Sequence, residues 1–558
     1  MPPAAKLGVY SVELRGKGEQ AQSLASGQFR VEAFRLPVLE GRVGPQQKDA
    51  LVSLRKVPVD VQVHYVELTR VPEVMRLLGA VGLTSREACG DTVRNVMACH
   101  LAGACPHEHL DVTPWAEAAF EHFVRNPLGQ RLPRKFKINF SGCSTDCGQA
   151  MFNDAGVVAV TRTLADGSVE AGFRVYIAGG LGATPHPAQA LEEFTTREDL
   201  LPTVEAVLRV FEQTGNRDNK LRARLKWVVD QLGIDEVRRR VLKVRHTLPA
   251  SSSWPGGIPE IVQKVGDAPA GRSSTIDATA VGQGVAVQLT PRDPYGRWVA
   301  TGVVRGAANG SVSAVAYAAL GDVTSAQFRA LASIQRELGA DVRLSNRQNI
   351  VFRGLTEAQL PVLFERLEAI GMARPGAELA RDVVACPGSD TCNIAVTQSR
   401  GLAAAIGEEL EAEGLAEVGG VRINISGCTN SCGQHHAADI GFFGAERRAH
   451  GQAAPGYQML LGGYVGQEQI HFGEKALRLP AKAAPKAAAR VIRRFNDERT
   501  AGEAFRSWMD RVGGATVVAA GLQDLGVFPS PTEAPDFYVD YGETGPFVAE
   551  VGDSECAV

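Results

Sequence analysis

The pattern of apolar and polar positions predicts a chain that mixes strands and helices. Apolar residues that return every three or four positions predict helices over residues 189–213, 219–243 and 326–338, and the proline-punctuated segment 480–499 leads into another. These elements do not follow a strict βαβ order, so the pattern favours an α+β fold over a doubly wound parallel sheet. Strands are expected where β-branched and aromatic residues gather in short segments, at residues 29–34, 59–66, 136–141, 173–179, 341–345, 349–354 and 421–426.

The chain contains an internal duplication. The segment ACHLAGAC, with Cys99 and Cys105, returns as ACPGSDTC after an offset of 287 residues. The segment KINFSGCSTDCGQ returns as RINISGCTNSCGQ at an offset of 285, and GFRVYIAGGLG returns as GYQMLLGGYVG at 284. Matched landmarks in the same order at a near-constant offset predict one unit of about 286 residues written twice.

Composition and charge narrow the function classes. Charged residues make up 22% of the chain and apolar residues 44%, as in ordinary globular proteins. The net charge of −3 gives no basic excess of the kind that nucleic-acid-binding proteins usually carry. The sequence has no run of 18 apolar residues and no secretory signal at its start, so a cytoplasmic location without a membrane span is expected. The 10 cysteines are too few for a disulfide scaffold, and in a reducing compartment paired cysteines favour metal or redox chemistry.

The cysteines of the second unit form two close pairs. Cys386 and Cys392 have C-x5-C spacing, Cys428 and Cys432 have C-x3-C spacing, and Cys428 lies 36 positions after Cys392. Four thiolates arranged in two such pairs are suited to a [4Fe–4S] cluster. Glycines beside the second pair are expected to leave room for a bulky cofactor. The alternatives are a structural zinc site, disulfides and buried inert thiols, although zinc usually takes C-x2–4-C pairs.

At these cysteines the chain resembles the sirohaem-dependent nitrite and sulfite reductase family. The segment SGCTNSCGQHHAADIGF, residues 426–442, matches the family signature around its last two cysteines. The upstream segment ACPGSDTCNIAVTQSRGLA, residues 385–403, is also typical of the family. In the first unit, GDTVRNV at 90–96 and LPRKFKI at 132–138 are similar to the family's substrate-side motifs. The resemblance extends over most of the chain.

The resemblance implies a pseudo-two-fold, duplicated architecture. Each unit would supply a ferredoxin-like half-domain and part of a central sirohaem and [4Fe–4S] domain. A stretch rich in Pro, Gly and Ser would link the two units. The expected parts are an N-terminal ferredoxin-like half-domain at residues 1–85, a first sirohaem-domain repeat at 86–246, a linker at 247–292, a second ferredoxin-like half-domain at 293–375, a second repeat at 376–510 and a C-terminal tail at 511–558.

The resemblance also implies an oxidoreductase. Its reaction would be the six-electron reduction of a small oxyanion, sulfite to sulfide or nitrite to ammonia, and residue types do not distinguish these substrates. Ferredoxin or a similar one-electron donor would be the partner, since the chain carries no flavin or nicotinamide signature. Sirohaem coupled to a [4Fe–4S] cluster would be the cofactor, with Cys432 ligating both the cluster and the sirohaem iron.

The resemblance assigns roles to two further groups of residues. Arg94, Lys135 and Lys137 would bind the anion and supply charge-assisted hydrogen bonds to its oxygens. Lys135 and Lys137 are expected to point to one face of the 136–141 strand because side chains alternate along a strand. The segment that carries Arg347, Gln348 and Asn349 would bind the cofactor.

One departure from the family pattern concerns the anion site. Pro58 and Val59 stand where the family's first unit carries an Arg-Gln pair. This difference motivates an alternative function, a repurposed iron–sulfur electron-transfer protein with an altered anion site. Cys89 and Cys556 have no assigned role.

A second departure is that the first unit carries its own complete four-cysteine set. The hypotheses are a second [4Fe–4S] cluster, a relic of duplication and simple buried thiols. By pseudo-symmetry this set would face Arg347, Arg381 and Arg422, where a second haem-like site is a further hypothesis. The set consists of Cys99, Cys105, Cys143 and Cys147.

Overall fold

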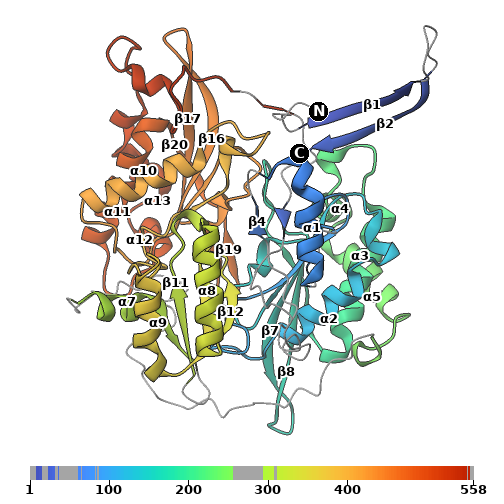
Figure 1. The fold of residues 1–558 in the computed structure, drawn as a ribbon. Coiled ribbons are helices and arrows are strands. Elements are labelled where there is room, and N and C mark those ends of the chain that lie inside the picture. Colours follow the sequence, from blue (N-terminus) through green and yellow to red (C-terminus); the bar gives the residue numbers. More distant parts are fainter. Residues whose placement is uncertain are drawn as a thin grey trace.

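The computed structural model shows an α+β protein built from two similar repeats, as the sequence predicts. Figure 1 shows the first repeat, in cyan and green, beside the second, in orange and red. Among the described residues, no helix is both long and apolar enough to cross a membrane. The structure describes residues 8–15, 23–31, 35–36, 61–63, 66–81, 83, 87–254, 293–306, 311–549 and 551–552.

Each repeat contains a five-stranded mixed sheet, and the two sheets have the same order and orientation of strands. The strand orders are β5-β6-β7-β8-β9 and β14-β15-β16-β17-β20. In both sheets the first three strands are parallel and the next two pairings are antiparallel. The strands are β5 (Val93–Ala98), β6 (Phe136–Ser141), β7 (Ala155–Thr163), β8 (Val169–Ile177), β9 (Gln189–Thr195), β14 (Val384–Ala385), β15 (Ile423–Ser426), β16 (Ile440–Ala449), β17 (Gln452–Leu461) and β20 (Glu474–Pro480).

Helices cover each sheet and close its core. Trp115 and Phe136 are almost wholly buried in the first repeat, and Phe442 and Trp508 in the second. Figure 1 shows α2, α3 and α5 on the outer side of the first sheet. The helices are α2 (Thr113–Phe123), α3 (Arg197–Thr214), α4 (Leu225–Leu232), α5 (Ile234–Arg245), α10 (Ser399–Ala412), α11 (Ala484–Glu498), α12 (Phe505–Arg511) and α13 (Gly514–Ala520).

A smaller antiparallel sheet precedes the second repeat. Its order is β10-β11-β13-β12, and three helices share its apolar core. Helix α8 begins at a capping box in which Thr324 and Gln327 satisfy each other's backbone N–H groups, so the predicted helix over 326–338 is confirmed. The elements are α7 (Pro294–Gly302), β10 (Val303–Arg305), β11 (Val312–Ala316), α8 (Ser325–Leu338), β12 (Asp341–Leu344), β13 (Ile350–Leu355) and α9 (Leu360–Glu368).

The N-terminal segment is described only in part. Pro58 and Val59 lie outside the described residues, as do Cys556 and residues 255–292 of the expected linker. The described elements are β1 (Gly8–Arg15), β2 (Ser23–Val31), β3 (Arg35–Leu36), β4 (Val61–Gln62) and α1 (Val71–Ala80).

Two helix predictions were wrong in part. Residues 189–195 form strand β9, because they pair with β8 and bury Leu191 and Thr195 on one face. The helix begins only after Thr196, whose side chain accepts a hydrogen bond from the N–H of Asp199. The predicted helix over 219–243 is interrupted at Gly233, whose φ of 80° ends α4 and starts α5.

The expected C-terminal tail packs against the second repeat. Asp540 accepts a hydrogen bond from the backbone N–H of Gln398 at 2.9 Å, and Tyr538 and Phe547 are buried. Residues 553–558, the last of the expected tail, lie outside the described residues.

A buried ion pair fixes the start of β7 in the first repeat, and its removal should destabilise the protein. Asp154 is fully buried and accepts hydrogen bonds from Arg224 at 2.7 and 3.2 Å. Arg224→Met would leave this carboxylate without its cation, at an expected cost of about 3–5 kcal/mol. Thermal unfolding should therefore show a clearly lowered midpoint. Arg239→Met, which removes an exposed partner of Glu236 on α5, is the control and should change the midpoint little. Equal midpoints for the two variants would contradict the prediction.

Candidate active site

Two parallel strands carry the second four-cysteine set to one edge of their sheet. Cys386 directly follows β14, and Cys428 follows β15 after a single glycine. The N–H of Cys386 donates to the carbonyl oxygen of Ile425 at 3.1 Å. The N–H of Gly427 donates to the Cys386 sulfur at 3.2 Å. Because adjacent parallel strands end at the same edge, Cys386 and Cys428 lie close together there.

The four thiols of this second set lie close enough to affect one another's ionisation. Burial first, and then the neighbouring Cys432, Cys386 and Cys392, raise the pKa of the Cys428 thiol to about 12. Burial and the nearby Cys432 also raise the pKa of Cys386. Four thiolates would therefore need a compensating positive core. Cys432 is exposed whereas Cys386 is buried, and no cysteine among the described residues forms a disulfide.

Glycines let the C-x3-C loop fold back on its own strand. A Cβ atom on Gly433 would lie 2.0 Å from the carbonyl oxygen of Ile425, and one on Gly427 would lie 2.7 Å from that of Thr397. No side chain fits at such distances. From the sequence, these glycines are expected to leave room for a cofactor, whereas the atoms closest to them belong to the protein's own backbone.

The basic residues expected at the substrate side belong to two adjacent strands. Arg94 lies on β5, and Lys135 and Lys137 lie around the start of β6. Arg94 is 7% exposed, and its Nε donates to the carbonyl oxygen of Gly90 at 2.7 Å. Lys135 directly precedes β6 and Lys137 is its second residue. Both lysines are half-buried, and Phe136, which stands between them in the sequence, is fully buried. This burial pattern agrees with the predicted alternation, which sends both lysines to one face. Their contact with an anion stays a prediction.

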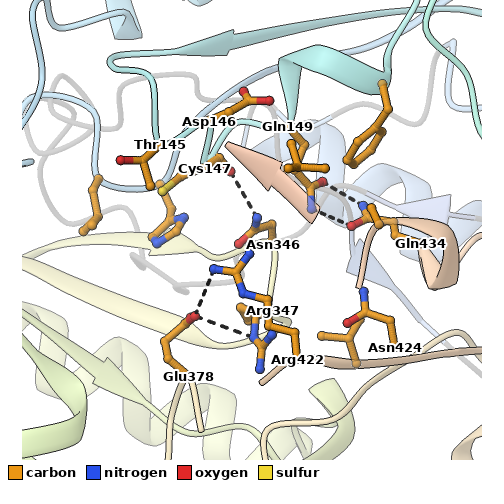
Figure 2. A pocket seen from close by; sticks show the side chains of 16 residues that line it. Thr145, Asp146, Cys147, Gln149, Asn346, Arg347, Glu378, Arg422, Asn424 and Gln434 are labelled. Carbon is orange, nitrogen blue, oxygen red and sulfur yellow. Dashed lines mark hydrogen bonds and ion pairs between the residues drawn. The ribbon is translucent and has the colours of Figure 1, made fainter. Parts of the chain in front are cut away.

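A pocket lies between the two repeats, next to the first four-cysteine set. Cys147 and Gln149 come from the first repeat, and Arg347, Arg422 and Glu378 face them from the second half (Figure 2). The carboxylate of Glu378 lies between the two guanidinium groups, 3.7 Å from Arg347 and 3.9 Å from Arg422. Both arginines are expected from pseudo-symmetry to face this set, and they line one pocket with Cys147. Arg381, the third expected residue, instead pairs with Glu411.

The three consecutive residues proposed for cofactor binding have different surroundings. Arg347 is 5% exposed and its Nη2 donates to the carbonyl oxygen of Asp382 at 2.7 Å, but its Nε and Nη1 have no hydrogen-bond partner. Gln348 makes two hydrogen bonds to the backbone of Ala385, next to Cys386. Asn349 is fully buried and hydrogen-bonds to the Ala318 backbone and to the Asp382 carboxylate. Arg347 is thus the member that reaches a pocket.

Sequence reasoning missed an amide pair that joins the two repeats. Gln149 and Gln434, 285 residues apart, donate to each other reciprocally at 2.5 and 2.7 Å. Both residues have left-handed backbone conformations, with φ of 59° and 60°. Their equivalent places in the repeated SGC-x3-CGQ motif were visible in the sequence, but the contact between them was not. Glu378 was missed as well, because no motif marks it.

The chain matches two family descriptions. Residues 89–248 and 376–527 match the family described as "Nitrite and sulphite reductase 4Fe-4S domain". Residues 308–370 match "Nitrite/Sulfite reductase ferredoxin-like half domain". Together the matched segments cover more than half of the chain and correspond to the two repeats and the smaller antiparallel sheet.

Relatives with assigned activities are similar over most of the chain. The assimilatory ferredoxin-dependent nitrite reductase of Haloferax mediterranei is 30% identical over 81% of this chain and 74% of its own length. The ferredoxin sulfite reductase of Mycobacterium tuberculosis is 29% identical over 81% of this chain and 75% of its own. The structure of the Mycobacterium tuberculosis NirA protein covers 82% of this chain and 78% of its own, with a TM-score of 0.65 and 28% identity.

Proposed function

The chain belongs to the nitrite and sulphite reductase 4Fe-4S family of oxidoreductases, and from this we propose that it reduces a small oxyanion by six electrons. The substrate would be sulfite, giving sulfide, or nitrite, giving ammonia. Ferredoxin or a similar one-electron donor would supply the electrons, as the names of the relatives state for those proteins. The observation that carries the proposal is the convergence of four thiols with one exposed member, Cys432, at the end of β14 and β15.

The second four-cysteine set fits a [4Fe–4S] cluster. Thiolates are the ligands that such clusters take, and here they come in two pairs from adjacent strand ends. The N–H of Gly427 already points at the Cys386 sulfur, as expected for a donor that stabilises a thiolate. Cys432 is exposed, and it would be the residue that holds the sirohaem iron as well as the cluster. Cluster and sirohaem together would store and relay the electrons delivered one at a time.

The basic residues of the first repeat would handle the substrate. Sulfite and nitrite are anions, so Lys135 and Lys137 on one face of β6 would attract and orient them. Arg94, on the adjacent parallel strand β5, would contribute a guanidinium group. Loss of oxygen from the substrate requires protons at that oxygen, and ammonium groups held nearby would stabilise the developing charge and donate hydrogen bonds to it.

The proposal predicts a defined spectrum and turnover. Anaerobically purified protein should show the Soret and long-wavelength bands of sirohaem and should oxidise reduced methyl viologen when sulfite or nitrite is added. Fully loaded protein without these bands would refute the sirohaem assignment. Loaded protein that accepts and passes on electrons but turns over neither anion would instead support the alternative, an iron–sulfur electron-transfer protein, which Pro58 and Val59 motivate.

A further inference from the structure

The first four-cysteine set lies on the same scaffold as the second. Cys99 directly follows β5, and its N–H donates to the carbonyl oxygen of Phe140 on the adjacent parallel strand β6 at 2.9 Å. The bond from Cys386 to Ile425 in the second repeat is its counterpart, at 3.1 Å. The strand ends that bring the second set together are therefore present in the first repeat too.

The two C-x3-C loops also use the same hydrogen bonds. Asn139 donates to the carbonyl oxygen of Gly148 at 2.6 Å, and the N–H of Gly148 donates to Ser141 Oγ at 3.0 Å. The matching bonds in the second repeat run from Asn424 to Gly433, at 2.9 Å, and from Gly433 to Ser426, at 3.1 Å.

The backbone of the first loop has the same unusual conformation. Asp146 and Ser431, the residues before the last cysteine of each set, have φ of 55° and 59°. A Cβ atom on Gly148 would lie 2.2 Å from the carbonyl oxygen of Phe140, and the corresponding distance for Gly433 is 2.0 Å. Left-handed conformations are uncommon outside glycine, so their retention at the same place indicates that the first loop keeps a demanding geometry.

The thiols of the first set lie close enough to affect one another's ionisation, as those of the second set do. Cys105 and Cys143 are hydrogen-bonded to each other, and Cys147 lies close enough to Cys99 and Cys143 for their charges to interact. Burial raises the pKa of Cys99 to about 12, and the neighbouring Cys143 raises it as well. Inert buried thiols would account for the burial but not for two pairs converging on loops that match a cluster-binding site.

The pocket next to this set is lined by both guanidinium and carboxylate groups. Four thiolates around a [4Fe–4S] core leave a net negative charge. Cys147 faces Arg347 and Arg422 across the pocket (Figure 2). Two nitrogens of the buried Arg347 lack a hydrogen-bond partner, although its Nε lies 3.5 Å from the Asp382 carboxylate and 3.7 Å from that of Glu378.

We propose that Cys99, Cys105, Cys143 and Cys147 hold a second [4Fe–4S] cluster. The proposal does not depend on which oxyanion is reduced. A cluster held there would take up one electron at a time from a reduced iron–sulfur donor, which would be oxidised by one electron, and would pass it toward the second four-cysteine set without making or breaking a bond. The reciprocal amides of Gln149 and Gln434, each two residues beyond the last cysteine of its set, join the two loops directly.

Counting acid-labile sulfide in the anaerobically purified protein tests the proposal. Two clusters give about eight labile sulfides per chain and one cluster gives about four. Native mass spectrometry of the same sample identifies the most fully loaded species, so incomplete loading is not mistaken for a missing site. A most fully loaded species with a single cluster would overturn the proposal, whatever the sirohaem spectrum and turnover show.

A matched pair of variants locates the second cluster. Cys105→Ser and Cys392→Ser change the same position of the C-x5-C pair in the two repeats. Cys105→Ser should halve the labile sulfide and keep the sirohaem bands, whereas Cys392→Ser should halve the sulfide and disturb those bands. Unchanged sulfide in folded Cys105→Ser would overturn the assignment. If that variant does not fold, the count on the unmodified protein still decides.

Discussion

Replacing Cys432 by serine is expected to abolish oxyanion reduction and to disturb the absorption bands of sirohaem. Cys432 is the exposed member of the second four-cysteine set, and it is the residue proposed to contact both the cluster and the sirohaem iron. A serine hydroxyl is a hard, weakly acidic ligand and replaces a thiolate poorly on iron. Loss of this one sulfur should therefore uncouple the two groups, and turnover should fall to background in the methyl viologen assay.

The equivalent cysteine of the first repeat provides the comparison. Cys147→Ser removes a thiol at the matching position, 285 residues earlier, in a loop of the same geometry. It should leave the sirohaem bands in place, because that cofactor is assigned to the other set. An active Cys432→Ser protein with normal bands would rule out the bridging role.

Lys137→Ala is expected to lower kcat by about 10²–10³-fold while the cofactors stay loaded, as for the loss of one group that stabilises charge on an oxygen. Lys137 is the second residue of β6, and its backbone N–H is fixed by Asp154 Oδ2 at 3.1 Å. The strand should therefore keep its place when the side chain is shortened. Steady-state kinetics with both anions, together with the absorption spectrum, would measure the effect.

Two further variants distinguish charge from packing. Lys137→Arg keeps a positive charge on the same face of β6 and should recover part of the activity. Lys243→Ala removes an exposed lysine from α5, away from the strand ends, and should leave turnover unchanged. If Lys137→Ala had the kinetics of Lys243→Ala, Lys137 would not belong to the anion site.

Local and periodic features were predicted well from the sequence. The repeat offset placed both cysteine sets at equivalent positions, and the two sheets have the same topology. The strand over 136–141 has the predicted bounds, and Lys135 and Lys137 stand on either side of the buried Phe136 in the sequence. These features depend on neighbouring residues and on spacing, which a single sequence displays directly.

Features that depend on distant partners were not predicted. Residues 189–195 fit a helical period, but pairing with β8 makes them a strand. Asn349 follows an arginine and a glutamine in one motif, yet its amide binds Asp382 inside the protein. The position of Glu378 between two arginines depends on how the halves pack, and nothing local in the sequence indicates it.

The reciprocal hydrogen bonds between Gln149 and Gln434 bear on the origin of the chain. In a homodimer with two-fold symmetry, a residue on the axis meets its own copy, and each of the two makes the same bond to the other. Gln149 and Gln434 occupy the same place in their repeats and satisfy this condition within one polypeptide. The contact is what would persist if two identical subunits had been fused end to end, each bringing its own four cysteines to the former dimer interface.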